Sequence, residues 1–241
     1  MTLPENKNEK LIKNTLNFYR EIGIDITFSN KIFKYNKKNV REKYHYYTQK
    51  NKDEKINELE NSFKNFDMCK LKKTSTNFVK FYGNTNSKLL IIDGPPDVEE
   101  DKKGISFVAG KGLLFEKMLN AIGLKIDETF IVKGIPWRPP GNRQPSDQEI
   151  KICRPFILNL INILKPKIIV CLGEVPTFQI FGLNESIIKL RGKWQKIKSN
   201  EFNCEFSVLS TFSISDLLNR PDLKKYAWKD MKLLREKIKE I

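Results

Sequence analysis

A proline-rich loop at residues 136–145 holds the densest group of side chains that could bind or act on a ligand. It carries two amides, two guanidinium groups and an indole, while four prolines and a glycine exclude regular structure from it. The loop follows Phe130–Val132, a run that predicts a buried strand. Because ligands of α/β proteins bind at the carboxyl ends of strands, the loop is a candidate site. The alternative is a surface loop that proline stiffens without any function.

Strands and helices alternate along the chain on both sides of this loop. Strands are predicted at 89–92, 130–132, 167–172 and 206–211, and helices at 53–66, 111–122, 148–164, 176–181 and 220–239. Ser146 with Glu149 three residues later predicts a capping box at the start of helix 148–164. The alternation predicts an α/β fold of three layers, α/β/α, around a central, mainly parallel four-stranded sheet.

The first 60 residues differ from the rest, because they are rich in Lys and Asn. An amphipathic helix is predicted at 11–22, and the basic, aromatic segment 28–47 suits either contact with a nucleic-acid backbone or a solvated linker. We therefore expect a basic, partly helical N-terminal extension at 1–60 and one main domain at 61–241.

The charge and hydropathy of the chain limit the kinds of partner that it can have. A net charge of +15 and a pI near 9.5 predict a polyanionic partner, most simply nucleic acid, although drift toward Lys, Asn and Ile would raise the pI without any ligand. No apolar run approaches the roughly 20 residues of a membrane span, and the N-terminus lacks a secretory signal pattern. We expect a cytoplasmic protein and, in the absence of an apolar self-association stripe, a monomer.

Cysteine and histidine are scarce and offer little chemistry of their own. The four cysteines have no metal-finger spacing, and Cys171 and Cys204 lie in or near predicted strands as small buried side chains. The single histidine is His45, so any mechanism that needs an imidazole depends on the N-terminal extension.

Taken together, four segments between residues 69 and 241 resemble the family 4 uracil-DNA glycosylases of the uracil-DNA glycosylase superfamily. The segments are 69–84, with Cys69, Thr74, Asn77 and Gly83; 99–112, with Glu99-Glu100-Asp101, Phe107 and Gly112; the loop 136–145 with Glu149 and Cys153; and 190–221, with Leu190-Arg191-Gly192 and Thr211-Phe212. The resemblance implies hydrolysis of the N-glycosidic bond of uracil flipped out of single- or double-stranded DNA. Extrusion of the base costs a few kcal/mol, which phosphate contacts from a basic protein help to offset.

The resemblance also assigns substrate-binding residues. Phe107 matches the phenylalanine on which the flipped base stacks, although it could instead be ordinary core. Asn142 and Arg143 match the family's loop, where they would shape the pocket wall or meet phosphate; Asn142 could equally form a turn beside Gly141. Leu217 and Arg220 lie in the segment that would probe the duplex.

Three positions depart from the family's motifs. Gly94 stands where a glutamate helps to position water, and Gly94 would border the substrate; Asp93 is the nearest carboxylate that could orient the water. Lys133 replaces an asparagine that reads the base, and lysine can only donate hydrogen bonds. Ser213 replaces a histidine that stabilises charge on the leaving uracil, and a neutral donor supports less charge. We expect a glycosylase of impaired activity, or alternatively a catalytically inactive DNA-binding or protein-interaction relative.

Many members of the family hold a 4Fe–4S cluster on four cysteines, as such clusters require. Cys69 and Cys153 match two of these positions, whereas Phe66 and Trp137 occupy the other two. We therefore expect no 4Fe–4S cluster and no other cofactor.

Overall fold

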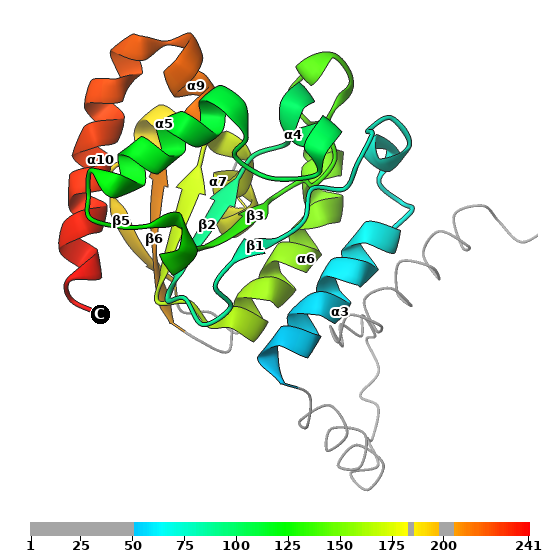
Figure 1. Ribbon diagram of the computed structural model, residues 1–241, viewed down its shortest axis with the longest axis horizontal. Coiled ribbons are helices and arrows are strands. Elements are labelled where there is room, and N and C mark those ends of the chain that lie inside the picture. Colours follow the sequence, from blue (N-terminus) through cyan, green and yellow to red (C-terminus); the bar gives the residue numbers. More distant parts are fainter. Residues whose placement is uncertain (1–50, 183–185, 198–204) are drawn as a thin grey trace, which may run out of the picture. The chain divides into compact units, whose positions relative to one another are not determined.

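The computed structural model describes residues 51–182, 186–197 and 205–241 (Figure 1). The chain divides into two compact units, residues 1–62 and 63–241. The predicted helix 11–22, the basic segment 28–47, His45 and Cys204 lie outside the described residues. Since residues 51–62 are the only described part of the first unit, the extension predicted for residues 1–60 stays a prediction.

The first described helix, α3 (Lys52–Asn65), confirms the helix predicted at 53–66. Its start is fixed by reciprocal bonds, because Asn51 Oδ1 accepts from the Glu54 amide (2.8 Å) while the Glu54 carboxylate accepts from the Asn51 amide (3.2 Å). Asp53 and Glu54 in the first turn also suit the positive end of the helix dipole.

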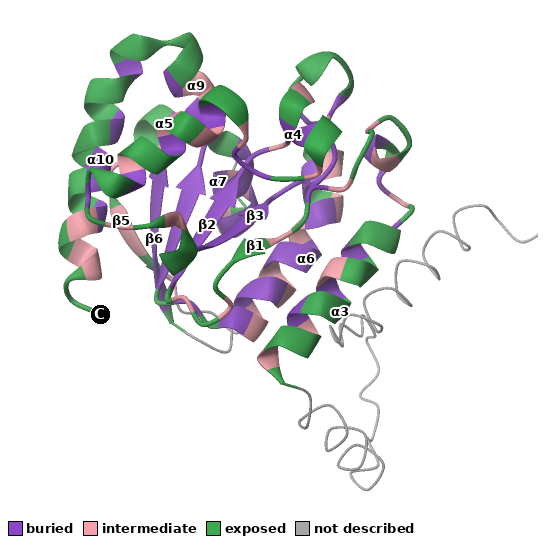
Figure 2. Ribbon diagram, viewed as in Figure 1, coloured by how far each residue is buried: buried purple, intermediate pink, exposed green. Residues whose placement is uncertain are grey.

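The second unit contains one six-stranded sheet with the strand order β1-β3-β2-β4-β6-β5. The strands are β1 (Tyr82–Gly83), β2 (Leu89–Asp93), β3 (Phe130–Lys133), β4 (Ile168–Leu172), β5 (Trp194–Ile197) and β6 (Phe206–Thr211). The four predicted strands are the parallel centre, β3-β2-β4-β6, and the two edge strands pair antiparallel to it. Figure 2 shows the central strands as uniformly buried. The edge strands were not predicted because β1 has two residues and β5 is only partly buried.

Helices cover both faces of the sheet and confirm the three layers. They are α4 (Val98–Lys103), α5 (Ala109–Asn120), α6 (Asp147–Leu164), α7 (Glu174–Phe181), α8 (Ile187–Leu190), α9 (Ile214–Asn219) and α10 (Lys224–Ile238), with short 3-10 turns at Lys70–Lys73, Ile126–Glu128, Pro140–Asn142 and Pro221–Leu223. On one face, α5, α9 and α10 share a core with Leu89 and Ile91 of β2. On the other face, α6 packs on α7, and α7 packs on β4 and β2. Among the described helices, none is long and apolar enough to cross a membrane.

The parallel strands end level with one another, which positions the candidate site. Asp93 pairs in register with Lys133 on one side and with Leu172 on the other, and Leu172 pairs with Thr211. The loops that follow β2, β3, β4 and β6 therefore leave the sheet along one edge. Asp93 and Lys133, predicted separately from sequence, are neighbours at this edge.

Candidate functional site

Four charged side chains form a buried cluster where β2 and β3 end. Lys133 Nζ donates to Asp93 Oδ2 (2.6 Å) and to Glu100 Oε1 (2.7 Å). Lys111 Nζ donates to Glu100 Oε2 (2.8 Å) and lies 3.7 Å from Asp93 Oδ2. The Lys133 and Glu100 side chains are 0% exposed. We call Asp93, Glu100, Lys111 and Lys133 the ion cluster.

Glu100 is the centre of the ion cluster because its two oxygens accept four hydrogen bonds. Besides the two lysines, the amides of Phe107 (2.7 Å) and Asp97 (3.1 Å) donate to it. Burial alone would raise the pKa of Glu100, but the charges of Lys133 and Lys111 outweigh burial and lower this pKa to about 2. Burial would likewise lower the pKa of Lys111, but Asp93 and Glu100 raise it. Glu100 and Lys111 are therefore both charged at neutral pH.

The formal charges of the site sum to a negative value. Lys111 Nζ also lies 3.7 Å from Asp97 Oδ2, so two ammonium groups face three carboxylates. A buried charge is tolerated only when it is paired and hydrogen bonded, which the cluster achieves for its lysines. The cluster therefore offers no net positive charge to an anion that forms beside it.

Phe107 lies next to the ion cluster. Its backbone has a φ of 55°, in the left-handed region, and a Cβ added at Gly112 would lie 2.1 Å from the Phe107 oxygen. Glycine at 112 therefore permits this sharp turn. The Phe107 ring stacks on Phe115 with 3.9 Å between centroids, and Lys133 Nζ lies 5.2 Å from the Phe107 centroid. Phe107 thus belongs to the core and also borders the ion cluster.

Gly94 follows Asp93 and borders open space. A Cβ built on Gly94 would meet no atom within 4 Å, and the Gly94 φ is not in the left-handed region. The contrast is Gly134 after β3, where a Cβ would lie 2.1 Å from Gln179 Oε1. Position 94 can therefore accept a side chain beside the ion cluster, whereas position 134 cannot.

Ser213 lies at the same edge of the sheet but is engaged as a helix cap. Its Oγ accepts from the Asp216 amide (3.0 Å) and donates to Asp216 Oδ2 (2.6 Å), which begins α9. Two strand spacings, about 10 Å, separate β6 from β2. A hydrogen bond from Ser213 to a ligand would have to replace the bond to Asp216.

The loop 136–145 is held by contacts within itself and to the start of α6. Asn142 has a φ of 56° and accepts from Arg138 Nε (2.7 Å), as expected of a residue that forms a turn. Arg143 makes a two-pronged ion pair with Glu149 (2.7 and 2.9 Å), and Glu149 completes the predicted capping box with Ser146. The structure therefore places Asn142 and Arg143 in an exposed turn and brings neither into contact with the ion cluster within the described residues.

The structure corrects the assignment of Leu217 to a surface that probes a duplex. Leu217 is 1% exposed and belongs to the core, because it lies on the same face of α9 as the buried Ile214. Leu218 is 42% exposed instead. Arg220 is exposed as expected and pairs with Asp222 at 3.2 Å.

The residues at the four positions that match cluster ligands do not fit a 4Fe–4S cluster. Cys69 and Cys153 are buried and hydrogen bonded to each other, which lowers the pKa of Cys69, while burial raises that of Cys153. At the other two positions, the Phe66 and Trp137 rings take part in an aromatic cluster: Phe66 lies 5.2 Å from Phe156 and Trp137 lies 5.4 Å from Phe63. Two thiols cannot supply four ligands. The described residues include no group of three or more His, Cys, Asp or Glu able to hold a metal ion.

Sequence reasoning placed Asp93, Phe107 and Lys133 in one site, and the structure brings these three together. It missed the roles of Glu100 and Lys111. Asp97 and Glu100, three residues apart, have the spacing of a capping box, and this signal would have predicted α4, a helix that is absent from the predicted elements. Lys111 gave no such signal, because a lysine within an amphipathic helix normally faces water.

Comparison with known proteins assigns the family. Residues 80–232 match the family described as "Uracil DNA glycosylase superfamily". The chain belongs to this superfamily. It is 38% identical over 173 residues to the type-4 uracil-DNA glycosylase of Sulfurisphaera tokodaii, an alignment that covers 70% of this chain and 78% of the relative.

Two further relatives show how far this similarity extends. The type-4 uracil-DNA glycosylase of Archaeoglobus fulgidus is 30% identical over 172 residues, which cover 70% of this chain and 85% of the relative. A DNA polymerase of Bacillus phage SP01 is 27% identical over 167 residues, which cover 68% of this chain and 17% of the polymerase. The type-4 relatives confirm the resemblance identified in the sequence.

Proposed function

We propose that this superfamily member acts in DNA repair by hydrolysing the N-glycosidic bond of a base, uracil first, that is flipped out of DNA. Its relatives are named type-4 uracil-DNA glycosylases, and its charge of +15 suits a DNA partner. The observation that carries the proposal is the meeting of Phe107, the ends of β2 and β3, and the open space at Gly94.

Binding of the base is assigned to Phe107 and Lys133. Base–aromatic stacking is worth roughly 1–3 kcal/mol per base, which offsets much of the cost of extrusion. The Lys133 ammonium would donate to a carbonyl oxygen of the base. To do so, it must give up one of its bonds to Asp93 and Glu100, so base binding competes with the ion cluster.

Bond cleavage leaves the electron pair of the glycosidic bond on the base nitrogen and a positive charge on the sugar carbon. Water then adds to that carbon and loses a proton, and the base gains one. Asp93, the carboxylate next to the open space at Gly94, would orient the water. Ser213 would donate to the leaving base in place of its bond to Asp216.

The electrostatics of the site support a slow reaction. The leaving base carries negative charge, whereas the ion cluster with Asp97 has a formal excess of one carboxylate. Loss of one preorganised donor to such an anion typically costs a factor of about 100 to 1,000 in rate. We therefore propose impaired excision, which is measured under single-turnover conditions.

A second candidate is a catalytically inactive relative that binds DNA. The bonds of Lys133 to two carboxylates and of Ser213 to Asp216 favour it, because both groups are already satisfied within the protein. A protein-interaction role is the third reading, and it predicts no DNA affinity.

The interpretation of the chain as a DNA glycosylase leads to further proposals. We propose a monomer in the cytoplasm that works on single- or double-stranded DNA without a 4Fe–4S cluster. Aromatic packing around Phe66 and Trp137 supports the last point and implies a colourless protein.

A gel-based excision assay on single- and double-stranded oligonucleotides that contain uracil, hypoxanthine or xanthine tests the function. Excision of uracil that is lost in Phe107→Ala and reduced in Ser213→Ala is the expected result. Salt-dependent DNA binding without excision would establish the second candidate. The absence of any DNA affinity would leave the third.

A further inference from the structure

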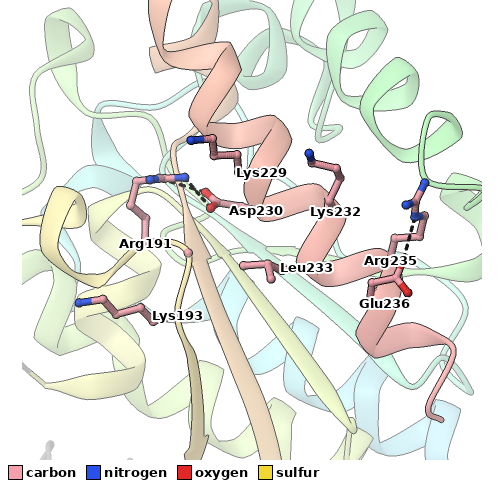
Figure 3. Close-up of a pocket in the computed structure, with 9 residues that line it drawn as sticks. Arg191, Lys193, Lys229, Asp230, Lys232, Leu233, Arg235 and Glu236 are labelled. Carbon is pink, nitrogen blue, oxygen red and sulfur yellow. Dashed lines mark hydrogen bonds and ion pairs between the residues drawn. The ribbon is translucent and has the colours of Figure 1, made fainter.

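A groove lies between α10 and the turn that leads into β5, and none of its lining residues belongs to the ion cluster. It has a volume of about 690 Å³ and is lined by Arg191, Gly192, Lys193, Lys229, Asp230, Lys232, Leu233, Arg235 and Glu236 (Figure 3). In Figure 3 the lysines rise from both sides of the hollow, with Leu233 between them.

A buried ion pair builds the groove and fixes its shape. Asp230 accepts from Arg191 Nε (3.0 Å) and Thr211 Oγ1 (2.6 Å), and Arg191 Nη2 also donates to the Tyr226 oxygen (2.7 Å). A Cβ at Gly192 would lie 2.7 Å from Asp230 Oδ1, so a glycine is needed for this close approach. The turn that carries Lys193 is therefore tied rigidly to α10.

Three lysines give the groove a positive charge. Arg191 is balanced by Asp230, and Arg235 by Glu236 at 3.2 Å. Lys193, Lys229 and Lys232 remain, and within the described part of the chain the structure records no ion pair for any of the three. Three uncompensated ammonium groups line one concave surface, which attracts a polyanion rather than a single small anion.

An exposed tryptophan extends this surface along α10. Trp228 is 41% exposed and lies one helical turn before Lys232, on the same face of α10. Lys224 and Lys225 precede it, and Arg220 lies just before α10 begins. A cationic groove beside an exposed aromatic ring is the combination that binds single-stranded nucleic acids, because unpaired bases stack on the ring.

We propose that this groove binds the sugar-phosphate backbone of single-stranded DNA, with Trp228 as the stacking platform for an unpaired base. The groove would hold the strand outside the base pocket. This inference rests on the proposed function only in taking DNA as the partner, and it holds whether or not the pocket cleaves a base.

The test measures binding of a fluorescent, uracil-free oligothymidine by anisotropy across a range of salt concentrations. The groove variant combines Lys193→Gln, Lys229→Gln and Lys232→Gln. The control combines Lys151→Gln, Lys165→Gln and Lys167→Gln, three exposed lysines elsewhere with the same total charge change. Each phosphate contact to a single strand contributes about 0.7 to the slope of log K against log salt, so the groove variant is expected to lower that slope by about 2 and the control by far less.

Trp228 gives an independent measurement. Trp228→Ala is expected to weaken binding roughly 5- to 150-fold, the range that stacking on one aromatic ring contributes. Trp228→Phe is expected to retain binding while it removes the quenching of tryptophan fluorescence by the oligonucleotide. Equal losses of slope in the groove and control variants, or full affinity in Trp228→Ala, would overturn the proposal. Excision measured on the same variants tests the pocket separately, because none of these residues contacts the ion cluster.

Discussion

Replacing Glu100 with glutamine removes the charge at the centre of the ion cluster while nearly preserving its shape. The pKa of Glu100 falls from 4.5 to about 2 on folding, and each pKa unit corresponds to about 1.4 kcal/mol, so its charge contributes about 3 kcal/mol to stability at pH 7. Breaking a buried ion pair by removing one partner costs about 3–5 kcal/mol, which agrees. We expect Glu100→Gln to lower the free energy of unfolding by about 3 kcal/mol, measured by urea denaturation at pH 7.

The stabilisation that the charge of Glu100 provides depends on pH. Because the folded pKa lies below the unfolded one, the stabilisation is fully present above pH 4.5 and is lost as the pH falls through 2. The difference between the wild type and Glu100→Gln is expected to shrink to about 2 kcal/mol at pH 3.5.

Glu99→Gln is the matched control, since Glu99 is the preceding residue in α4 but is exposed and pairs with the exposed Lys102 at 3.3 Å. It is expected to change stability by less than about 0.5 kcal/mol. A cost below about 1 kcal/mol for Glu100→Gln, or a cost equal to that of the control, would refute the account of the ion cluster.

Three other predictions use matched pairs or a direct observation. Gly112→Ala places a Cβ 2.1 Å from the Phe107 oxygen and is expected to lower the free energy of unfolding by about 2 kcal/mol, measured by thermal denaturation. Gly110→Ala in the same helix places a Cβ with no atom within 4 Å and is expected to raise that free energy by up to about 1 kcal/mol. Similar values for both variants would contradict the assigned turn at Phe107. Leu217→Ala is expected to lower the free energy of unfolding, measured by urea denaturation, by about 2–5 kcal/mol because Leu217 lies in the core. Leu218→Ala is expected to change it by less than about 0.5 kcal/mol because Leu218 is exposed. The reverse order would show that Leu217 lies on the surface. The protein purified without oxygen is expected to show no visible absorption band and no bound iron, and a stoichiometric iron content would contradict the aromatic packing at Phe66 and Trp137.

The sequence predicted the central elements of the fold because their patterns are local. Apolar runs such as 168–172 are buried on both faces, which is typical of parallel strands. The pair Ser146 and Glu149 predicts the start of α6. The strand β5 gave no comparable pattern, because it is a partly buried edge. The strand β5 is held by pairing with β6, and the periodicity of a sequence does not show which strands pair.

The candidate site was predictable in part for a similar reason. Asp93 and Lys133 lie 40 residues apart and meet only because β2 and β3 pair in register. The sequence shows two polar residues at strand ends, but not that Glu100 and Lys111 enclose them. Leu217 was misassigned because its neighbour Leu218 has the same side chain, and the start of α9 decides which of the two faces the core.

Single-turnover excision of uracil from a single-stranded oligonucleotide decides the proposed base site, with the wild type, Phe107→Ala and Gly94→Gln compared at excess protein. We expect slow excision by the wild type and none by Phe107→Ala. The proposed site also implies at least roughly tenfold faster excision by Gly94→Gln, because the added amide enters open space beside Asp93, where it can orient water without adding to the negative charge beside the leaving base. A wild type that excises no base, or a Phe107→Ala variant as active as the wild type, would contradict it.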